Sequence, residues 1–336
     1  MRHVLVLGGT AWLGREIAQA VARTGAQVTC AARGVSGRPP PDVDFVRLDR
    51  LAPGAYEGLT REWDDVIELS HDPGLVVPAL ETLGPLARHW TVISSVSVYE
   101  RNDAPGADES AATVEVQDTT VYAQAKVAAE QAARERLEDR LLVARPCLIV
   151  GPGDTSDRFG YWPARLAESA DDEVLTPETE GRHVQVIDVA DLAHWISDAG
   201  ARQETGVVNA VGESLPMADF LEEAARVCGF GGRFVSASDE WLQKHDVRYW
   251  SGPRSLPLWL PQEITAMAQR NSDAFRAKGG QCRTMRETLS RALEDERARG
   301  VSRKRRSGLT RSEEELLLCG IRKEGWVRPR RARMLT

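Results

Sequence analysis

The sequence predicts an α/β fold, a doubly wound parallel sheet with a smaller C-terminal α/β lid. Over the first 150 residues, short β-branched runs alternate with longer helical stretches, which is typical of parallel strands joined by crossover helices on both faces of a sheet. A glycine-rich turn, Gly8–Gly14, directly follows the first strand candidate. Beyond Pro146 the composition of the sequence changes, because Pro, Gly and Trp become frequent there. This change predicts a second, smaller unit.

The elements of the main sheet are expected in a regular order. The first strand, Val4–Leu7, leads through the glycine turn into a helix from Trp12 to Arg23. Further strands are expected at Gln27–Ala31, Val43–Leu48, Val66–Leu69, Thr91–Ile93 and Leu141–Ala144. Helices are expected at Gly74–Ala87 and Thr120–Leu137. Two later segments, His183–Ile187 and Val207–Ala210, are expected to return to the main sheet as strands.

These patterns divide the chain into three parts. The main α/β domain is expected at residues 1–154 plus 183–211, and the lid at residues 155–182 plus 212–300. Residues 301–336 form a basic tail, since eleven Lys or Arg stand against four Glu between 303 and 333. We expect a solvated terminus here. Docking on the acidic body or on a partner, and weak binding of polyanions, stay open as alternatives.

Composition excludes several classes of protein. The 336 residues are 42% hydrophobic, which is enough for a sizeable core and excludes a disordered chain. A net charge of −7 argues against nucleic-acid binding by a general positive field, and no apolar run approaches the ~20 residues of a membrane span. The five cysteines form no C-x-x-C pair and the six histidines show no paired spacing. We therefore expect reduced thiols, no metal site and a cytoplasmic location.

The glycine-rich turn predicts a dinucleotide-binding site of the Rossmann type. A residue without a side chain allows the tight turn, free N–H groups at the helix start face a pyrophosphate, and Gly14 lets the helix pack closely on the strand. A glycine turn alone is weak, but here a strand precedes it and a helix follows it. The residues expected to contact the cofactor at this turn are Gly8, Gly9, Thr10, Trp12, Leu13 and Gly14.

The tip of the second strand indicates which dinucleotide binds. Sites for NAD usually place an acid about 20 residues past the glycines, but between Gly14 and Asp42 the chain has only Glu16. Arg33 stands at the strand tip instead, and a guanidinium there can hold a 2′-phosphate. NADP(H) is therefore the preferred cofactor, with NAD(H) as the alternative.

Tyr122 and Lys126 are four residues apart on a helical stretch, so both side chains lie on one helix face. A phenol has a pKa near 10 and needs a neighbouring cation to act as an acid or base at neutral pH. Ser95 ends a strand 27 residues earlier. A hydroxyl at the carboxyl end of a parallel strand points into the crevice where ligands bind and can donate to a carbonyl oxygen.

Taken together, Gly8–Gly14, Ser95, Tyr122 and Lys126 resemble the short-chain dehydrogenase/reductase superfamily in its extended form, which also holds epimerases and dehydratases of nucleotide sugars. The resemblance covers roughly residues 1–300 and is closest to actinobacterial-type proteins labelled epimerase or reductase. Two departures stand out. Ala11 replaces the middle glycine of the usual turn, and Val96-Ser97 replaces the Asp-Glu pair of the sugar dehydratases. Without that acid pair, elimination of water from a keto sugar is not expected.

The resemblance implies roles for individual residues. Ser95 would polarise the substrate carbonyl, Tyr122 would be the general acid in reduction, and Lys126 would bind the nicotinamide ribose and lower the pKa of Tyr122. Pro146 would lie at the carboxamide of the cofactor. The resemblance also implies weaker cofactor contacts at Asp49 and Ser70, and a homodimer formed by the helices around 74–87 and 120–137.

The substrate is expected to contact loops at the carboxyl edge of the sheet and the lid. Candidates by position are Tyr99, Arg158, Trp162, His183 and Trp250. The Trp-rich, acid-poor stretch 241–261 favours an apolar or aromatic substrate. The sequence thus predicts an NADP(H)-dependent reductase of a small carbonyl or imine compound. A nucleotide-sugar 4-epimerase with recycled cofactor, and a non-catalytic dinucleotide- or RNA-binding protein, are the alternatives.

Overall fold

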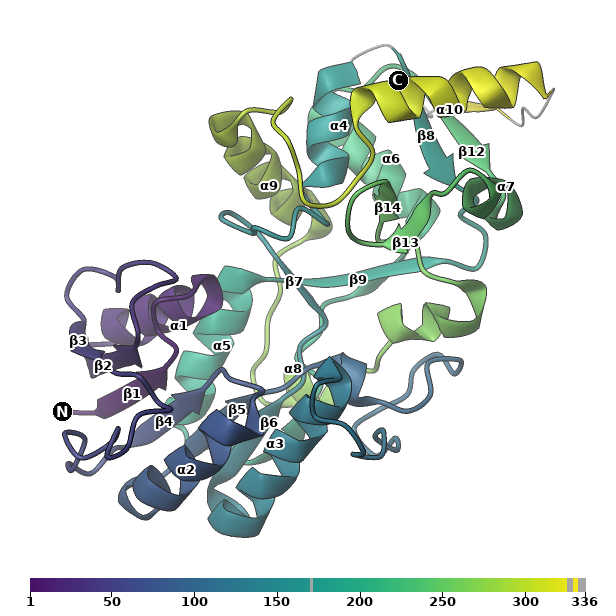
Figure 1. Cartoon of the computed structure of the whole chain (residues 1–336). Coiled ribbons are helices and arrows are strands. Elements are labelled where there is room, and N and C mark those ends of the chain that lie inside the picture. Colours follow the sequence, from purple (N-terminus) through teal and green to yellow (C-terminus); the bar gives the residue numbers. More distant parts are fainter. Residues whose placement is uncertain (170–171, 325–328, 332–336) are drawn as a thin grey trace. The chain divides into compact units, whose positions relative to one another are not determined.

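A computed structural model describes residues 1–169, 172–324 and 329–331 of the chain (Figure 1). The chain forms two compact units. Residues 1–149, 186–213 and 270–282 make up the first unit, and residues 150–185, 214–269 and 283–336 belong to the second. The contacts thus place 270–282 with the first unit, a segment that the sequence assigns to the lid.

Strands β1–β6 and β10 of the first unit form one sheet of seven strands in the order β10-β6-β5-β4-β1-β2-β3, and every neighbouring pair is parallel. Strands buried on both faces read as continuous apolar runs, and Val4–Leu7 is indeed fully buried. The strand order reverses between β1 and β4, where ligands of doubly wound sheets bind. The strands are β1 (His3–Leu7), β2 (Gln27–Ala32), β3 (Asp44–Arg47), β4 (Asp65–Glu68), β5 (Trp90–Ile93), β6 (Leu141–Ala144) and β10 (Gly206–Val208).

Helices cover both faces of this sheet (Figure 1). Helix α1 packs on α5, and α2 packs on α3, so the fold is the doubly wound α/β fold that the sequence predicts. The predicted bounds of α1 agree with the structure at both ends. The helices of this unit are α1 (Trp12–Arg23), α2 (Pro73–Leu83), α3 (Tyr122–Leu137), α5 (Val189–Ala201), α8 (Asp273–Ala277) and the short 3-10 helices η1 (Gly84–Leu86), η2 (Val96–Val98) and η3 (Glu138–Arg140).

The second unit is a smaller α/β body. Strand β12 pairs in parallel with β8 and antiparallel with β15, β13 pairs with β14, and α4, α6 and α9 pack on one another. Its strands are β8 (Glu173–Pro177), β11 (Ser214–Pro216), β12 (Arg233–Ala237), β13 (Arg248–Trp250), β14 (Ser255–Pro257) and β15 (Pro329–Arg331). Its helices are α4 (Tyr161–Ser169), α6 (Met217–Cys228), α7 (Asp239–Lys244), η4 (Gln262–Ala268), α9 (Met285–Arg299) and α10 (Arg311–Lys323).

One predicted strand does not join the main sheet. The segment 183–187 belongs to β9 (His183–Asp188), which lies with β7 (Leu148–Val150) and β11 in a separate three-stranded sheet. Residues His183–Gln185 pair antiparallel with β11, and β7 lies on the other side of β9, so both edges of β9 are taken within this small sheet. The other predicted returning strand, β10, does join it beside β6.

The basic tail is not a solvated terminus over residues 301–324. Helix α10 begins at a capping box formed by Thr310 and Glu313 and buries Leu317, Leu318 and Ile321. Docking on the chain's own body, one of the open alternatives, is therefore what the structure shows for this part. Residues 325–328 and 332–336 of the predicted tail lie outside the described residues.

Two further properties bear on the sequence expectations. All five cysteines are free thiols. In the part of the chain that the structure describes, no helix combines the length and the apolar character that crossing a bilayer requires.

Candidate functional site

The turn after β1 is built around three glycines. Gly8 has a left-handed φ of +95°, and its N–H donates to the carbonyl of Ala31 at 2.9 Å. A Cβ on Gly9 would lie 2.3 Å from the Cys30 sulfur, and a Cβ on Gly14 would lie 2.5 Å from the Gly8 carbonyl oxygen. A side chain is therefore disfavoured at Gly8 by the backbone conformation, and it is excluded at Gly9 by Cys30 of β2 and at Gly14 by the backbone of the turn.

Ala11, which replaces the usual middle glycine, fits this turn without strain. It is the N-cap of α1, has an extended φ of −80° and is exposed. Its side chain cannot accept a hydrogen bond from the first N–H groups of the helix, and no side-chain cap is present. A helix start without a side-chain cap, next to a glycine turn, is the arrangement that binds a phosphate group.

The tip of β2 carries a positive charge. Arg33 follows Ala32 directly and is exposed. The neighbouring thiol of Cys30 lies below the glycine turn, donates to the carbonyl of Gly9, and has a pKa raised to about 12 by burial. This thiol stays protonated and carries no charge. The guanidinium of Arg33, directly after β2, is therefore the charged group at the carboxyl end of this strand.

Lys126 is held at the carboxyl ends of β4 and β5. Its side chain is 3% exposed, and its Nζ donates to the carbonyl of Ile93 at 2.5 Å and to that of Leu69 at 3.5 Å. Burial lowers the pKa of Lys126 to about 8, although the carboxylates of Glu68 and Glu130 oppose that change. A buried amine that titrates so close to neutrality is typical of functional sites.

Tyr122 is the first residue of α3 and lies one turn before Lys126. Its side chain is 47% exposed, and the Nζ of Lys126 lies 5.9 Å from the centre of its ring. The sequence spacing therefore places the phenol and the ammonium on one face, as expected. Ser95 lies at the end of β5 and is the N-cap of η2, where its hydroxyl donates to the hydroxyl of Ser97 at 3.0 Å and accepts from the Ser97 N–H.

The remaining expected cofactor residues lie after other strands of the main sheet and after β4: Asp49 after β3, Ser70 after β4 and Pro146 after β6. Pro146 follows β6 and its carbonyl accepts from the N–H of Val96 at 3.0 Å, so it ties the end of β6 to η2. The hydroxyl of Ser70 accepts from the N–H of Asp72 at 3.1 Å. Asp49 accepts from the N–H of Leu51 at 3.2 Å. Both polar side chains are thus used locally to shape turns.

Sequence reasoning missed an ion pair beside this site. The guanidinium of Arg50 donates to both carboxylate oxygens of Glu68, with one nitrogen at 2.9 Å, and the N–H of Ser70 donates to the same carboxylate at 2.8 Å. Because Glu68 also acts on the charge of Lys126, it links Ser70 and Lys126. No local pattern joins two residues that lie 18 positions apart in the chain.

Tyr99 was expected to contact the substrate, but it is only 1% exposed. Its ring lies between the guanidinium groups of Arg145 and Arg270, at 4.9 and 4.1 Å, and its hydroxyl donates to Asn209 at 2.5 Å. Arg145 in turn donates to the buried carboxylate of Glu130 at 2.9 and 2.6 Å. Tyr99 therefore belongs to a buried polar cluster, and its expected substrate contact is not retained.

Of the four expected substrate residues of the second unit, one is fully buried and three are partly exposed. Trp162 is fully buried and its indole N–H donates to the carbonyl of Pro257 at 2.8 Å, so it is a core residue and this expectation is corrected. Arg158 lies over the ring of Trp250 at 5.4 Å, and Trp250, half-buried, has a left-handed φ of 67°. His183 is also half-buried.

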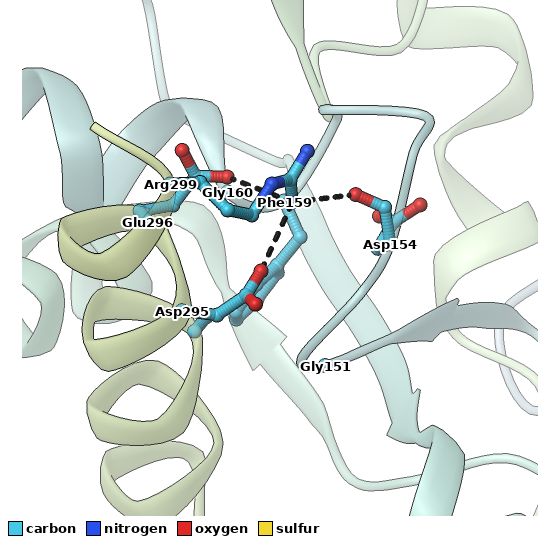
Figure 2. A pocket seen from close by; sticks show the side chains of 8 residues that line it. Gly151, Asp154, Phe159, Gly160, Asp295, Glu296 and Arg299 are labelled. Carbon is cyan, nitrogen blue, oxygen red and sulfur yellow. Dashed lines mark hydrogen bonds and ion pairs between the residues drawn. The ribbon is translucent and has the colours of Figure 1, made fainter. Parts of the chain in front are cut away.

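A small cavity lies in the second unit beside α9, and Figure 2 shows its charged lining. Its volume of about 10 Å³ suits a single water molecule. The guanidinium of Arg299 donates to the carbonyl of Asp154 and to the carboxylate of Asp295, both at 2.9 Å. Because of its small volume, the cavity cannot hold a metabolite. Its lining residues are Gly151, Asp154, Phe159, Gly160, Ala292, Asp295, Glu296 and Arg299.

Comparison with known proteins identifies the family of the chain. Residues 4–212 match the model of a family described as the NAD dependent epimerase/dehydratase family. Among curated proteins, none matches the chain significantly.

Solved structures of the same fold are similar to the chain at low identity. An epimerase from Methanothermobacter thermautotrophicus is 16% identical, with a TM-score of 0.65, over 88% of this chain and 92% of that one. A UDP-glucuronic acid 4-epimerase from Bacillus cereus in complex with NAD is 13% identical, with a TM-score of 0.64, over 88% and 99%. A dTDP-glucose 4,6-dehydratase from Bacillus anthracis, also with NAD, is 13% identical, with a TM-score of 0.64, over 94% and 100%. These likenesses establish the fold.

Proposed function

Since the chain belongs to the NAD-dependent epimerase/dehydratase family, we propose that it is an NADP(H)-dependent reductase of a small carbonyl or imine compound. The observation that carries this proposal is the pairing of an exposed phenol, Tyr122, with the buried ammonium of Lys126 at the ends of β4 and β5. A positioned acid beside a fixed positive charge is what protonation of a developing alkoxide requires.

Each residue of the pair has a separate task. Tyr122 donates its phenolic proton to the oxygen or nitrogen of the substrate double bond. Lys126 stabilises the resulting phenolate by its charge. Ser95, whose hydroxyl is held at the start of η2, would turn its O–H from the hydroxyl of Ser97 to the same substrate oxygen and so orient it.

The turn after β1 suits a dinucleotide, because its glycines allow a tight strand-to-helix turn and α1 begins without a side-chain cap. Gly8, Gly9, Gly14 and the first N–H groups of α1 would hold the pyrophosphate, together with Thr10, Trp12 and Leu13. Asp49 would hold the adenine, Ser70 and Lys126 the nicotinamide ribose, and Pro146 the carboxamide. When bound, the nicotinamide supplies the hydride of the reduction. Arg33 would pair with the 2′-phosphate of NADP(H).

The substrate class rests on the second unit. We assign the substrate contacts to Arg158, His183 and Trp250, which are not fully buried. Trp250 favours a planar or apolar group, whereas Trp241 and Trp259 of the same stretch are core residues at 5% and 0% exposure. The small-molecule substrate would therefore be apolar or aromatic at one end. A homodimer through α2 and α3 is part of the same proposal.

A nucleotide-sugar 4-epimerase is the second candidate, and the likeness to sugar epimerases favours it. Epimerisation uses the same Tyr and Lys but returns the hydride to the substrate, so the cofactor stays bound and is recycled. Dehydration is disfavoured because Val96 is a buried apolar residue and Ser97 carries a hydroxyl group. The carboxylate pair that would act as acid and base in the elimination of water is therefore missing at these positions.

In the non-catalytic, RNA-binding alternative the tail would supply the positive charge, but two of its arginines are engaged within their own unit. The guanidinium groups of Arg303 and Arg305 contact the buried carboxylate of Glu296, the latter at 2.7 Å. Arginines that neutralise carboxylates of their own unit are not free to release counterions from a nucleic acid.

The deciding experiment compares the wild-type chain with Tyr122→Phe. We expect wild type to consume NADPH with a panel of aromatic and aliphatic ketones, aldehydes and imines. The variant should lose turnover by on the order of 100-fold or more, while binding of NADPH, measured by its fluorescence, stays nearly unchanged. Equal turnover in both proteins would reject the proposal. Cofactor retained through purification, with sugar epimerised and no net NADPH consumed, would select the epimerase.

A further inference from the structure

A histidine that the expected catalytic set does not include lies against Tyr122. His71 follows β4 and is exposed, and its ring meets the ring of Tyr122 edge-on, with centroids 5.0 Å apart and an interplanar angle of 65°. Both side chains belong to the first unit. The imidazole therefore touches both the phenol and solvent.

The surroundings of His71 keep its imidazole neutral near pH 7. Burial of part of the ring lowers the pKa of His71, the positive charge of Lys126 lowers it further, and the carboxylate of Asp72 opposes both effects. A neutral imidazole carries one N–H donor and one nitrogen acceptor. It can therefore accept a proton on one nitrogen while it donates from the other.

Lys126 is poorly placed to exchange protons with solvent. Its side chain is 3% exposed, and its Nζ already donates to two backbone carbonyls. In the proposed reduction, Tyr122 gives up its proton in every turnover and must regain one. A substrate bound at the phenolic oxygen would cover that oxygen from solvent, whereas the ring of His71 already lies against the ring of Tyr122.

We propose that His71 is a proton relay between solvent and Tyr122, an inference that rests on the proposed reductase function. A water molecule gives a proton to one imidazole nitrogen, and the other nitrogen gives its proton to the phenolate oxygen of Tyr122. The imidazole ends as the opposite neutral tautomer, proton exchange with solvent restores the starting tautomer before the next turnover, and the hydroxide formed is neutralised by buffer. No electrons move, and oxidation of an alcohol would run the same path in reverse.

The kinetic test uses three variants of His71. His71→Ala and His71→Phe should each lower kcat by on the order of 100-fold, with KM little changed, because an intramolecular proton donor is lost. Added imidazole should restore much of the kcat of His71→Ala. His71→Phe keeps an aromatic edge against Tyr122 but has no titratable nitrogen, and His71→Gln keeps polar groups that cannot relay, so both should stay slow.

A matched control comes from α5, where His194 is exposed. His194→Ala should keep wild-type kcat and should not respond to imidazole. Wild-type kcat in His71→Phe, or a failure of imidazole to raise the kcat of His71→Ala, would overturn the relay. The proposed function itself is tested separately, since Tyr122→Phe with full turnover would reject both.

A second readout needs neither cofactor nor activity. Nuclear magnetic resonance of the histidine rings should show that the pKa of His71 rises in Lys126→Met, because the neighbouring positive charge is removed. Lys304→Met, which changes an exposed lysine of the tail, is the control and should leave His71 unchanged. A His71 that titrates identically in wild type and Lys126→Met would show that the two groups do not interact, and the relay would be rejected.

Discussion

Arg50 and Glu68 form a nearly buried ion pair at the carboxyl end of β4, with side chains 8% and 0% exposed. Both carboxylate oxygens of Glu68 accept from the guanidinium. Arg50 also donates to the hydroxyl of Tyr56 at 2.9 Å and to the carbonyl of Leu75 at 2.8 Å. The pair thus joins the loop after β3 to the start of α2. It lies next to Ser70, whose N–H donates to Glu68.

This pair predicts a large asymmetry between single and double variants. Arg50→Met leaves the carboxylate of Glu68 buried without its partner, and we expect it to lower the free energy of unfolding by about 3–5 kcal/mol. Arg50→Met combined with Glu68→Leu removes both charges and should cost much less. Urea unfolding of Arg50→Met, of Glu68→Leu and of the double variant measures this. A double variant as unstable as the sum of the singles would contradict the role of the buried charge.

The tip of β2 predicts a selective effect on cofactor binding. Arg33→Ala removes a charge-assisted contact to a 2′-phosphate, so the Kd of NADPH should rise about 10- to 100-fold. The Kd of NADH, which has no such phosphate, should change little. Fluorescence titration with both nucleotides gives the two constants. Arg23→Ala, which changes an exposed residue in the last turn of α1, is the control. Equal losses for both nucleotides would reject the assignment of Arg33.

A buried His–Asp pair predicts how stability depends on pH. His89 Nδ1 lies 2.8 Å from a carboxylate oxygen of Asp65. Burial lowers the pKa of His89, but the hydrogen bond and charge of Asp65 outweigh it, so the net pKa is raised above 6.5. A group whose pKa is raised in the folded state stabilises the protein when it is protonated. This stabilisation is complete at pH values below the pKa of the unfolded chain, and it is lost as the pH rises through the pKa of the folded chain.

We therefore expect His89→Gln to cost more free energy of unfolding at about pH 6 than at about pH 9. Urea unfolding at both pH values gives the two differences from wild type. His194→Gln, on the exposed face of α5, should show no such dependence. A cost for His89→Gln that grows with pH would show that the imidazole is neutral in the folded chain.

The local features of the fold were predictable because they depend on neighbours in the sequence. Helix α1 and the turn before it follow from Gly8, Gly9 and Gly14, whose missing side chains are required by contacts within the same strand–turn–helix unit. The pairing of Tyr122 with Lys126 follows from helical spacing alone. The apolar strands β1 and β6 follow from burial on both faces.

Features that depend on distant partners were not predictable in this way. Nothing near His71 in the sequence places it against Tyr122, 51 positions later. Strand β9 reads in the sequence like a strand of the main sheet, but it pairs with β11 and β7 in a separate sheet. The hydroxyl of Tyr99 and the indole N–H of Trp162 would suit a binding site. In the structure, however, they donate to acceptors that are distant in the sequence, Asn209 and the carbonyl of Pro257, and both side chains are buried.

The tail is the largest correction, because its charge suggests a solvated segment and its helix is amphipathic. Glu314 of α10 is buried and contacts the guanidinium of Arg165, and its other oxygen accepts from the N–H of Leu175 at 2.8 Å. Burial raises the pKa of Glu314, although Arg165 opposes this. Helix α10 is therefore bound to α4 and β8 by a carboxylate as well as by apolar side chains.

Removal of residues 301–336 should prevent the second unit from folding stably. Exposing or losing each of Leu317, Leu318 and Ile321 costs about 1.5–3 kcal/mol, and the truncation also leaves Arg165 buried without its carboxylate. The sum is comparable with the stability of an ordinary domain. Thermal unfolding and limited proteolysis should show a molten or aggregated product. Leu317→Ala offers a milder test, with an expected loss of about 2–5 kcal/mol. A chain truncated at residue 300 that melts like wild type would show that α10 contributes nothing to the fold.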